Sequence, residues 1–207
     1  MTTVDTLAAR ARALADRGRR AILGITGGPG SGKTTLAERL RRELGPDWVA
    51  HVPMDGFHLA DVELARLGRT DRKGAPDTFD AAGYAALLRR IRSDRGTIYA
   101  PSFERAVEQP IAGSIPIAAS VRLVITEGNY LLLPHGDWAD VRPQLDEVWF
   151  CEPAEEVRVR RLIARHERFG KTREEAVAWA LGTDQRNAEL VATTRGRADV
   201  VVTSTEA

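Results

Sequence analysis

The chain has 207 residues, of which 43% are hydrophobic and 29% are charged. This length and composition predict one globular domain over residues 1–207 and exclude the disordered and fibrous classes. Thirty basic against 29 acidic side chains leave a formal net charge of +1, so no overall field attracts nucleic acid or an anionic membrane.

We expect no targeting or membrane segment at the N-terminus. Residues 2–20 mix arginine and aspartate with alanine and leucine, and so lack the continuous apolar stretch of a signal peptide or a membrane span. Leu7, Ala11 and Leu14 recur at helical spacing and predict a short amphipathic helix. The single Cys151 excludes an intramolecular disulfide. These features favour a cytoplasmic protein without a membrane partner.

Short apolar runs recur along the chain without polar alternation, as is typical of strands buried on both faces of a parallel sheet. They predict strands at residues 21–26, 49–54, 121–126, 148–151 and 200–202. Helical patterns cover residues 34–44, 80–95 and 154–169, and Thr172 with Glu175 forms a capping box that opens another helix. Strands alternating with helices predict a three-layer α/β fold around a five-stranded, mainly parallel sheet. Residues 58–118 are interpreted as an insertion beside the site.

A glycine-rich turn between the first strand and the next helix matches the Walker A pattern in full. Such a turn directs successive backbone N–H groups inward as an anion nest, and the following helix adds its positive end. Lys33 can then reach the β- and γ-phosphates of ATP, and the Thr34 hydroxyl can bind Mg²⁺. The predicted nucleotide-binding residues are Gly27, Gly28, Pro29, Gly30, Ser31, Gly32, Lys33, Thr34 and Thr35.

Two carboxylates stand at the ends of predicted strands, where ligands bind in open α/β sheets. Asp55 follows the second strand and is suited to accept the proton of an attacking hydroxyl. Glu127 ends the third strand as the acid of a Walker B element, which would hold Mg²⁺ or orient a substrate. The structural alternatives are a helix cap for Asp55 and a turn acid for Glu127.

The helix predicted at residues 154–169 is rich in arginine, and we interpret residues 154–170 as a lid. Arginines on a closing lid stabilise the charge that phosphoryl transfer spreads over the γ-phosphoryl oxygens. Arg161 and Arg165 are the predicted catalytic pair. A solvated helix face is the alternative for this charge run.

Together these segments resemble the phosphoribulokinase, uridine kinase and type I pantothenate kinase family of P-loop kinases. Beyond the glycine-rich loop, the resemblance rests on the segments MDGFH (54–58), RKGAPDTFD (72–80), YAPSF (99–103) and ITEGNY (125–130). It implies that Asp55 is the catalytic base, that residues 73–80 border the acceptor pocket and that Asn187 contacts the acceptor. Pantothenate kinases carry a histidine where this chain has Phe103, Glu104 and Arg105.

We therefore expect a kinase that transfers the γ-phosphate of Mg·ATP to a hydroxyl of a small sugar, nucleoside or pantothenate-like acceptor. The predicted acceptor contacts are Asp55, His58, Lys73, Tyr99, Arg105, Glu127 and Asn187. A nucleoside monophosphate kinase and a P-loop ATPase or switch remain as alternatives, although the chain lacks the Asn-Lys-x-Asp signature of GTPase switches. The partner is a small molecule rather than nucleic acid, and a homodimer is left open.

Overall fold

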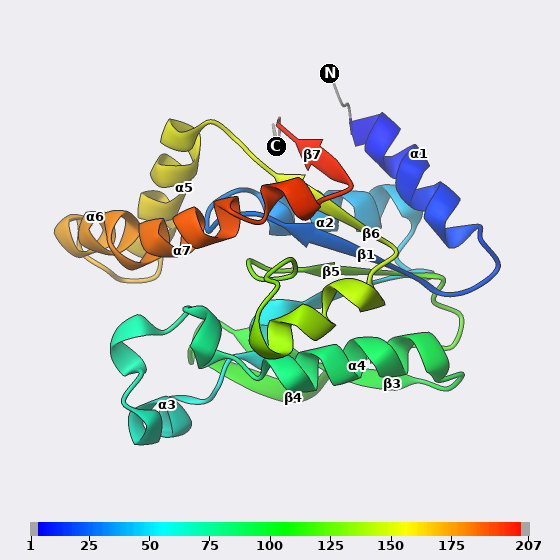
Figure 1. Cartoon of the computed structure of the whole chain (residues 1–207), viewed down its shortest axis with the longest axis horizontal. Helices are drawn as coiled ribbons and strands as arrows, with labels where there is room; N and C mark the ends of the chain where they lie inside the picture. Colours follow the sequence, from blue (N-terminus) through cyan, green and yellow to red (C-terminus); the bar gives the residue numbers. More distant parts are fainter. Residues whose placement is uncertain (1–3, 204–207) are drawn as a thin grey trace.

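A central sheet of five parallel strands organises the computed structural model, which describes residues 4–203. In spatial order the strands are β2 (Val49–Pro53), β5 (Leu123–Glu127), β1 (Ala21–Thr26), β6 (Glu147–Cys151) and β7 (Val200–Val202). All five predicted strands are confirmed, each within two residues of its predicted ends. Their carboxyl ends point toward the side from which α3 and α5 to α7 project (Figure 1).

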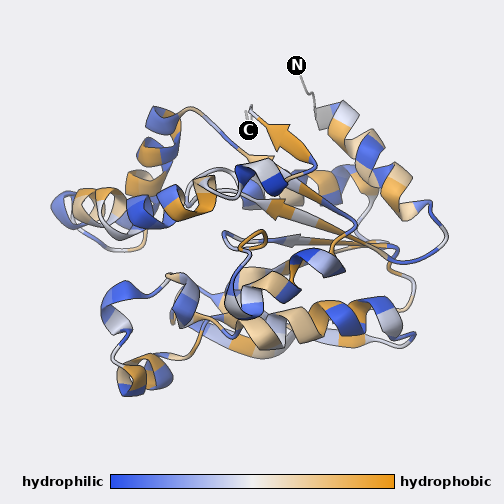
Figure 2. Ribbon diagram, viewed as in Figure 1, coloured by the Kyte–Doolittle hydropathy of each residue, from blue (hydrophilic) through white to orange (hydrophobic). Residues whose placement is uncertain are grey.

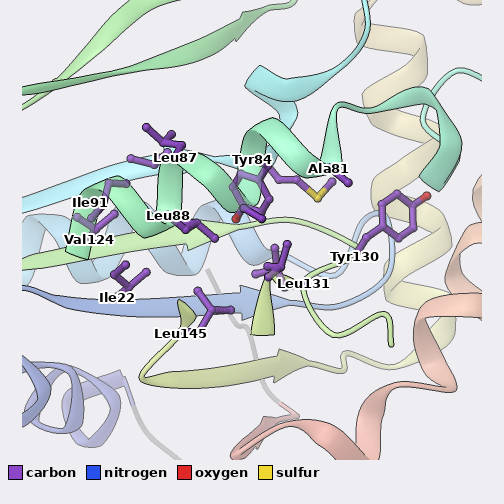
Figure 3. Packing of buried hydrophobic residues seen from close by; sticks show 14 of the residues in the cluster. Ile22, Ala81, Tyr84, Leu87, Leu88, Ile91, Val124, Tyr130, Leu131 and Leu145 are labelled. Atoms are coloured by element: carbon purple, nitrogen blue, oxygen red, sulfur yellow. The ribbon is translucent and has the colours of Figure 1, made fainter. Parts of the chain in front are cut away.

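Helices cover both faces of this sheet, which gives the predicted three layers. On one face α1 (Val4–Ala15) and α2 (Lys33–Leu44) enclose a core with Leu23, Ile25 and Trp149. On the other face α4 (Ala81–Ser93) packs through Tyr84, Leu88 and Ile91 (Figure 3). The central strands are largely hydrophobic, whereas the helices carry both kinds of residue (Figure 2). The predicted α/β P-loop fold is confirmed.

Three helices near the C-terminal end include the segment 154–170 interpreted above as a lid, and we call them the lid helices. They are α5 (Glu155–Arg168), α6 (Arg173–Leu181) and α7 (Thr183–Ala192). The predicted capping box opens α6: the Thr172 hydroxyl accepts the Glu175 backbone N–H, and the Glu175 carboxylate accepts the Thr172 backbone N–H. Among residues 4–203, no helix is both long and apolar enough to cross a membrane.

A β-hairpin lies beside the sheet, in the segment where the sequence gives no clear pattern. Its antiparallel strands are β3 (Ile98–Glu104) and β4 (Gln109–Ile117). The turn places Glu108, not a glycine, at a positive φ of 52°, so the usual glycine signal for a hairpin is missing from the sequence.

Short helical turns complete the connections between these elements. The α-helix α3 (Asp61–Leu67) lies between the first two of them. The 3₁₀ turns are η1 (Met54–Phe57), η2 (Thr70–Arg72), η3 (Pro76–Thr78), η4 (Gly136–Asp140), η5 (Arg142–Gln144) and η6 (Arg195–Arg197). The turn η1 matters most for the site because it carries Asp55 directly from the end of β2.

Candidate active site

The glycine-rich loop connects β1 to α2 and is built against the lid. Gly30 and Gly32 have φ values of 81° and 86°, which favour glycine. A Cβ atom on Gly30 would lie 2.8 Å from the backbone oxygen of Arg158 and 2.7 Å from Cγ of Leu162, both on α5. The loop therefore needs glycine both for its own turn and to admit the lid helix.

Lys33 is folded into this loop. Its ammonium donates hydrogen bonds of 3.0 Å to the backbone oxygens of Gly27 and Gly28, and the residue is only 8% exposed. Burial lowers the pKa of Lys33, and the negative charge of Glu127 opposes that shift. The ammonium is thus held at the loop by neutral carbonyl oxygens, which leaves its charge available to an anion bound there.

Glu127 and Thr34 meet below the loop. The Thr34 hydroxyl donates a 3.0 Å hydrogen bond to Oε1 of Glu127, which is 6% exposed at the end of β5. Burial, followed by the charge of Asp55, raises the pKa of Glu127 to about 7, and Lys33 and Thr34 oppose the shift. Among residues 4–203, no group of three or more His, Cys, Asp or Glu side chains could hold a metal ion. Such a sparse oxygen set suits Mg²⁺, which takes one or two protein ligands beside phosphate and water.

Asp55 lies across from the loop and is paired with an arginine of the hairpin. Its Oδ2 is 3.2 Å from Nη2 of Arg105. The Arg105 guanidinium also lies over the rings of Phe103 and Phe169, with 5.8 Å to each centroid. The side chain of Asp55 does not cap a helix, because its partner is Arg105 and not a backbone N–H at a helix start.

His58 is fixed by packing rather than by charge. Its ring lies 4.0 Å from that of Phe79 and 4.7 Å from that of Phe103, and Nδ1 is 2.8 Å from the backbone oxygen of Asp55. Burial lowers the pKa of His58, against the charge of Asp55. We infer that the histidine supports the turn that presents Asp55.

These groups border a cleft of about 600 Å³. Residues near the phosphate loop line one part, namely Pro29, Lys33, Thr34 and Glu127. A second set comes from the segment between η1 and the hairpin: Asp55, His58, Lys73, Phe103 and Arg105. A third set comes from the lid: Arg165, His166, Phe169, Trp179, Asp184 and Asn187. In Figure 1 the lid helices lie above the elements that carry the second set, and residues from both groups line the same cleft.

Two predicted site residues lie elsewhere. Tyr99 is 61% exposed and does not line the cleft, because strand alternation turns it away while its neighbours Ile98 and Ala100 are buried. Arg161 does not line the cleft either, whereas Arg165, about one helical turn further along α5, does. The roles of both residues remain predictions, and in each case the side of the element on which the residue stands keeps it out of the cleft.

Arg165 itself has an unusual environment. Its guanidinium lines the cleft, and among residues 4–203 it has no hydrogen bond or ion pair with another group. Burial, followed by the charge of Arg105, lowers the pKa of Arg165. The side chain is partly buried without a hydrogen-bonded anion in the described part of the chain, while the charges of Asp184, Asp55 and Glu127 act on it at longer range. An anion bound in the cleft would offset the cost of burying this cation.

Two interactions of the lid helices have no counterpart among the sequence-based predictions. Arg158, which is 5% exposed, donates to the backbone oxygen of Pro29 at 3.1 Å and also contacts Glu155 and Gln185. It ties α5 and α7 to the phosphate loop. His166 and Asp184 join α5 to α7 through a 2.7 Å contact between Nε2 and Oδ2. The arginine run could have suggested Arg158, but no sequence signal pairs His166 with Asp184.

Comparison with known proteins gives a consistent result. No family model matches the chain. It is 34% identical over 98% of its length, and 91% of the relative's, to "Putative uridine kinase C227.14" of Schizosaccharomyces pombe. It is 28% identical to a pantothenate kinase of Enterococcus faecalis, over 89% of this chain and 69% of the relative. The crystal structure of a "putative fructose transport system kinase" from Silicibacter sp. TM1040 is 33% identical, superposes with a TM-score of 0.87, and matches 97% of this chain and 98% of its own.

Proposed function

The chain belongs to the family of P-loop kinases that includes uridine and pantothenate kinases, and we propose that it transfers the γ-phosphate of ATP to a hydroxyl of a small polar alcohol. This proposal depends mainly on one observation: residues of the phosphate loop, Asp55 and Arg165 line the same cleft. A base on one side and an unpaired cation on the other suit an acceptor hydroxyl attacking a phosphoryl group between them.

In this mechanism the protein positions the reactants and compensates their charge. The oxygen of the acceptor hydroxyl bonds to the γ-phosphorus while Asp55 accepts the proton of that hydroxyl. The bond between the γ-phosphorus and the β,γ-bridging oxygen breaks, and ADP is released. Lys33 and Arg165 face the charge on the transferred phosphoryl group. Mg²⁺, held by Thr34 and by Glu127 directly or through water, would neutralise phosphate charge.

The acceptor is proposed to be a sugar or a sugar-like alcohol. Lys73 donates to Asp61 Oδ1 at 2.7 Å and to the Glu108 backbone oxygen at 2.6 Å, so much of its hydrogen-bonding capacity is used within the protein. Arg105 and Asn187 then supply planar donors to the cleft, and Phe103 and Trp179 supply aromatic faces. Several hydroxyl groups on one small molecule would satisfy this mixed lining. Sites that hydrogen-bond their substrate strongly reject analogues without the partner group, so we expect a narrow acceptor class.

An acceptor panel tests the proposal. ADP release with Mg·ATP should rise with one class among fructose, ribulose 5-phosphate, uridine, cytidine and pantothenate, and sugars are expected to give the largest rise. Mass spectrometry should find one added phosphate on the acceptor. Stimulation by a nucleoside monophosphate alone would instead support a monophosphate kinase. ADP release that no acceptor changes, but a protein partner triggers, would support a switch.

Replacement of Arg165 by alanine should lower kcat by roughly one to two orders of magnitude. Its guanidinium faces charge that develops in the transition state, so KM for ATP should change less than kcat. Arg161→Ala, which alters the same helix outside the cleft, is the matched comparison and should keep a kcat near that of the wild type. Steady-state kinetics of both variants measure kcat and KM and thus test the role of Arg165. If kcat fell equally in the two variants, together with a drop in Tm, the role of Arg165 would be purely structural.

A further inference from the structure

A histidine behind the site has a buried nitrogen without a hydrogen bond. His51 lies in β2, and among residues 4–203 its Nε2 atom has no hydrogen-bond partner. Buried polar atoms in proteins are almost always paired, because leaving one unpaired costs free energy that an apolar side chain would not. The position therefore needs an explanation beyond packing.

Strand geometry places His51 beneath Glu127. Alternation along β2 puts Val49 and His51 on one face, and the parallel pairing of Val49 with Leu123 and of His51 with Ile125 puts Glu127 on the same face of β5. Nε2 of His51 is 3.8 Å from Oε1 of Glu127. This is the oxygen that accepts the Thr34 hydroxyl. His51 and Thr34 thus approach one carboxylate oxygen.

His51 can donate a hydrogen bond to Glu127. An imidazole ring carries at least one N–H in either of its ordinary protonation states. When that proton is on Nε2, a small rotation of Glu127 would bring the carboxylate from 3.8 Å to hydrogen-bonding distance.

We propose that His51 is a positioning residue that holds Glu127 in the orientation needed for phosphoryl transfer. It acts through Glu127 and touches neither nucleotide nor acceptor. The inference rests on the proposed function, because the role of Glu127 toward Mg²⁺ or substrate belongs to it. With His51 in place, the Glu127 carboxylate has donors from two elements, Thr34 of α2 and His51 of β2, and its orientation no longer depends on the metal alone.

Two substitutions separate positioning from packing. His51→Leu removes the donor but adds apolar volume beside Val49 and Ile125, which belong to the adjoining core. We expect its Tm to equal or exceed that of the wild type, while kcat falls about tenfold and half-saturation by Mg²⁺ rises severalfold. His51→Gln carries an amide N–H and should recover part of both losses. His135→Leu changes a histidine that is exposed and outside the cleft and serves as the control.

A second measurement does not depend on turnover. Titration calorimetry of ADP with and without Mg²⁺ reports how strongly the metal aids nucleotide binding, and His51→Leu should reduce this effect while His51→Gln reduces it less. Wild-type kcat and Mg²⁺ dependence in His51→Leu would overturn the proposal. So would a loss of Tm that parallels the loss of activity and is not relieved in His51→Gln. If no acceptor stimulates the wild type, the proposed function fails, yet the calorimetric comparison still decides the role of His51.

Discussion

Replacing Lys33 with alanine is expected to abolish phosphoryl transfer and to leave the fold intact. The ammonium is held by two carbonyl oxygens of the loop and has no carboxylate within salt-bridge distance among residues 4–203, so we expect its charge to act on the β- and γ-phosphates. Loss of that charge removes stabilisation of both bound ATP and the transition state. We expect kcat/KM to fall by roughly three orders of magnitude or more.

The fold should survive because burying the charge of Lys33 costs free energy, as its lowered pKa indicates. Removing that charge removes the cost. Lys33→Met keeps most of the apolar stem and should match the wild type in Tm while remaining inactive. Circular dichroism with a coupled ADP assay measures both properties. Turnover near the wild-type value in either variant would show that the glycine-rich loop does not bind the transferred phosphate.

Asp55→Asn should lower kcat by roughly a hundredfold to ten-thousandfold while ATP binding is retained. The amide keeps the shape of the side chain and can still accept from Arg105 at the observed 3.2 Å position, but it cannot take up the proton of the acceptor hydroxyl. Nucleotide affinity should change little because the role proposed for Asp55 is toward the acceptor and not toward the nucleotide.

Asp71→Asn provides the matched control. Asp71 has a side chain that is 78% exposed and lies outside the cleft, so its loss should leave kcat unchanged. Rapid-quench kinetics would show whether the slowed step in Asp55→Asn is the chemical one. An unchanged kcat in Asp55→Asn would mean that the acceptor hydroxyl loses its proton elsewhere, and Asp55 would then serve the pairing with Arg105.

The sequence was informative wherever the signal was local. Continuous apolar runs predicted the five central strands because strands buried on both faces need no polar residue. The glycine pattern located the phosphate loop, and the strand ends located Asp55 and Glu127, since carboxyl ends of parallel strands meet at one edge. The capping box at Thr172 was predicted correctly because its two residues lie within one turn of the same helix.

Interactions between distant segments were beyond the sequence. The helix α7 was not predicted because its buried positions include the polar Asp184 and Asn187, which hide the apolar period. The site includes the pair of Arg158 with Pro29 and the approach of His51 to Glu127. Their formation depends on how helices and strands stack, which no short window encodes. The sequence pattern also does not separate Arg161 from Arg165 on one arginine-rich helix, and of the two only Arg165 lines the cleft.

Cys151 offers a practical consequence. It is the only cysteine of the chain, it is buried at the end of β6, and burial raises the pKa of its thiol to about 12. Maleimides react with an exposed thiolate, which is the attacking nucleophile, so the native protein should be unreactive toward them. A pair of cysteines introduced at exposed positions on the hairpin and on α5, such as Val107 and Arg168, could therefore carry fluorophores without a background label. Energy transfer between them would show whether the lid helices and the hairpin approach each other when ATP and an acceptor bind.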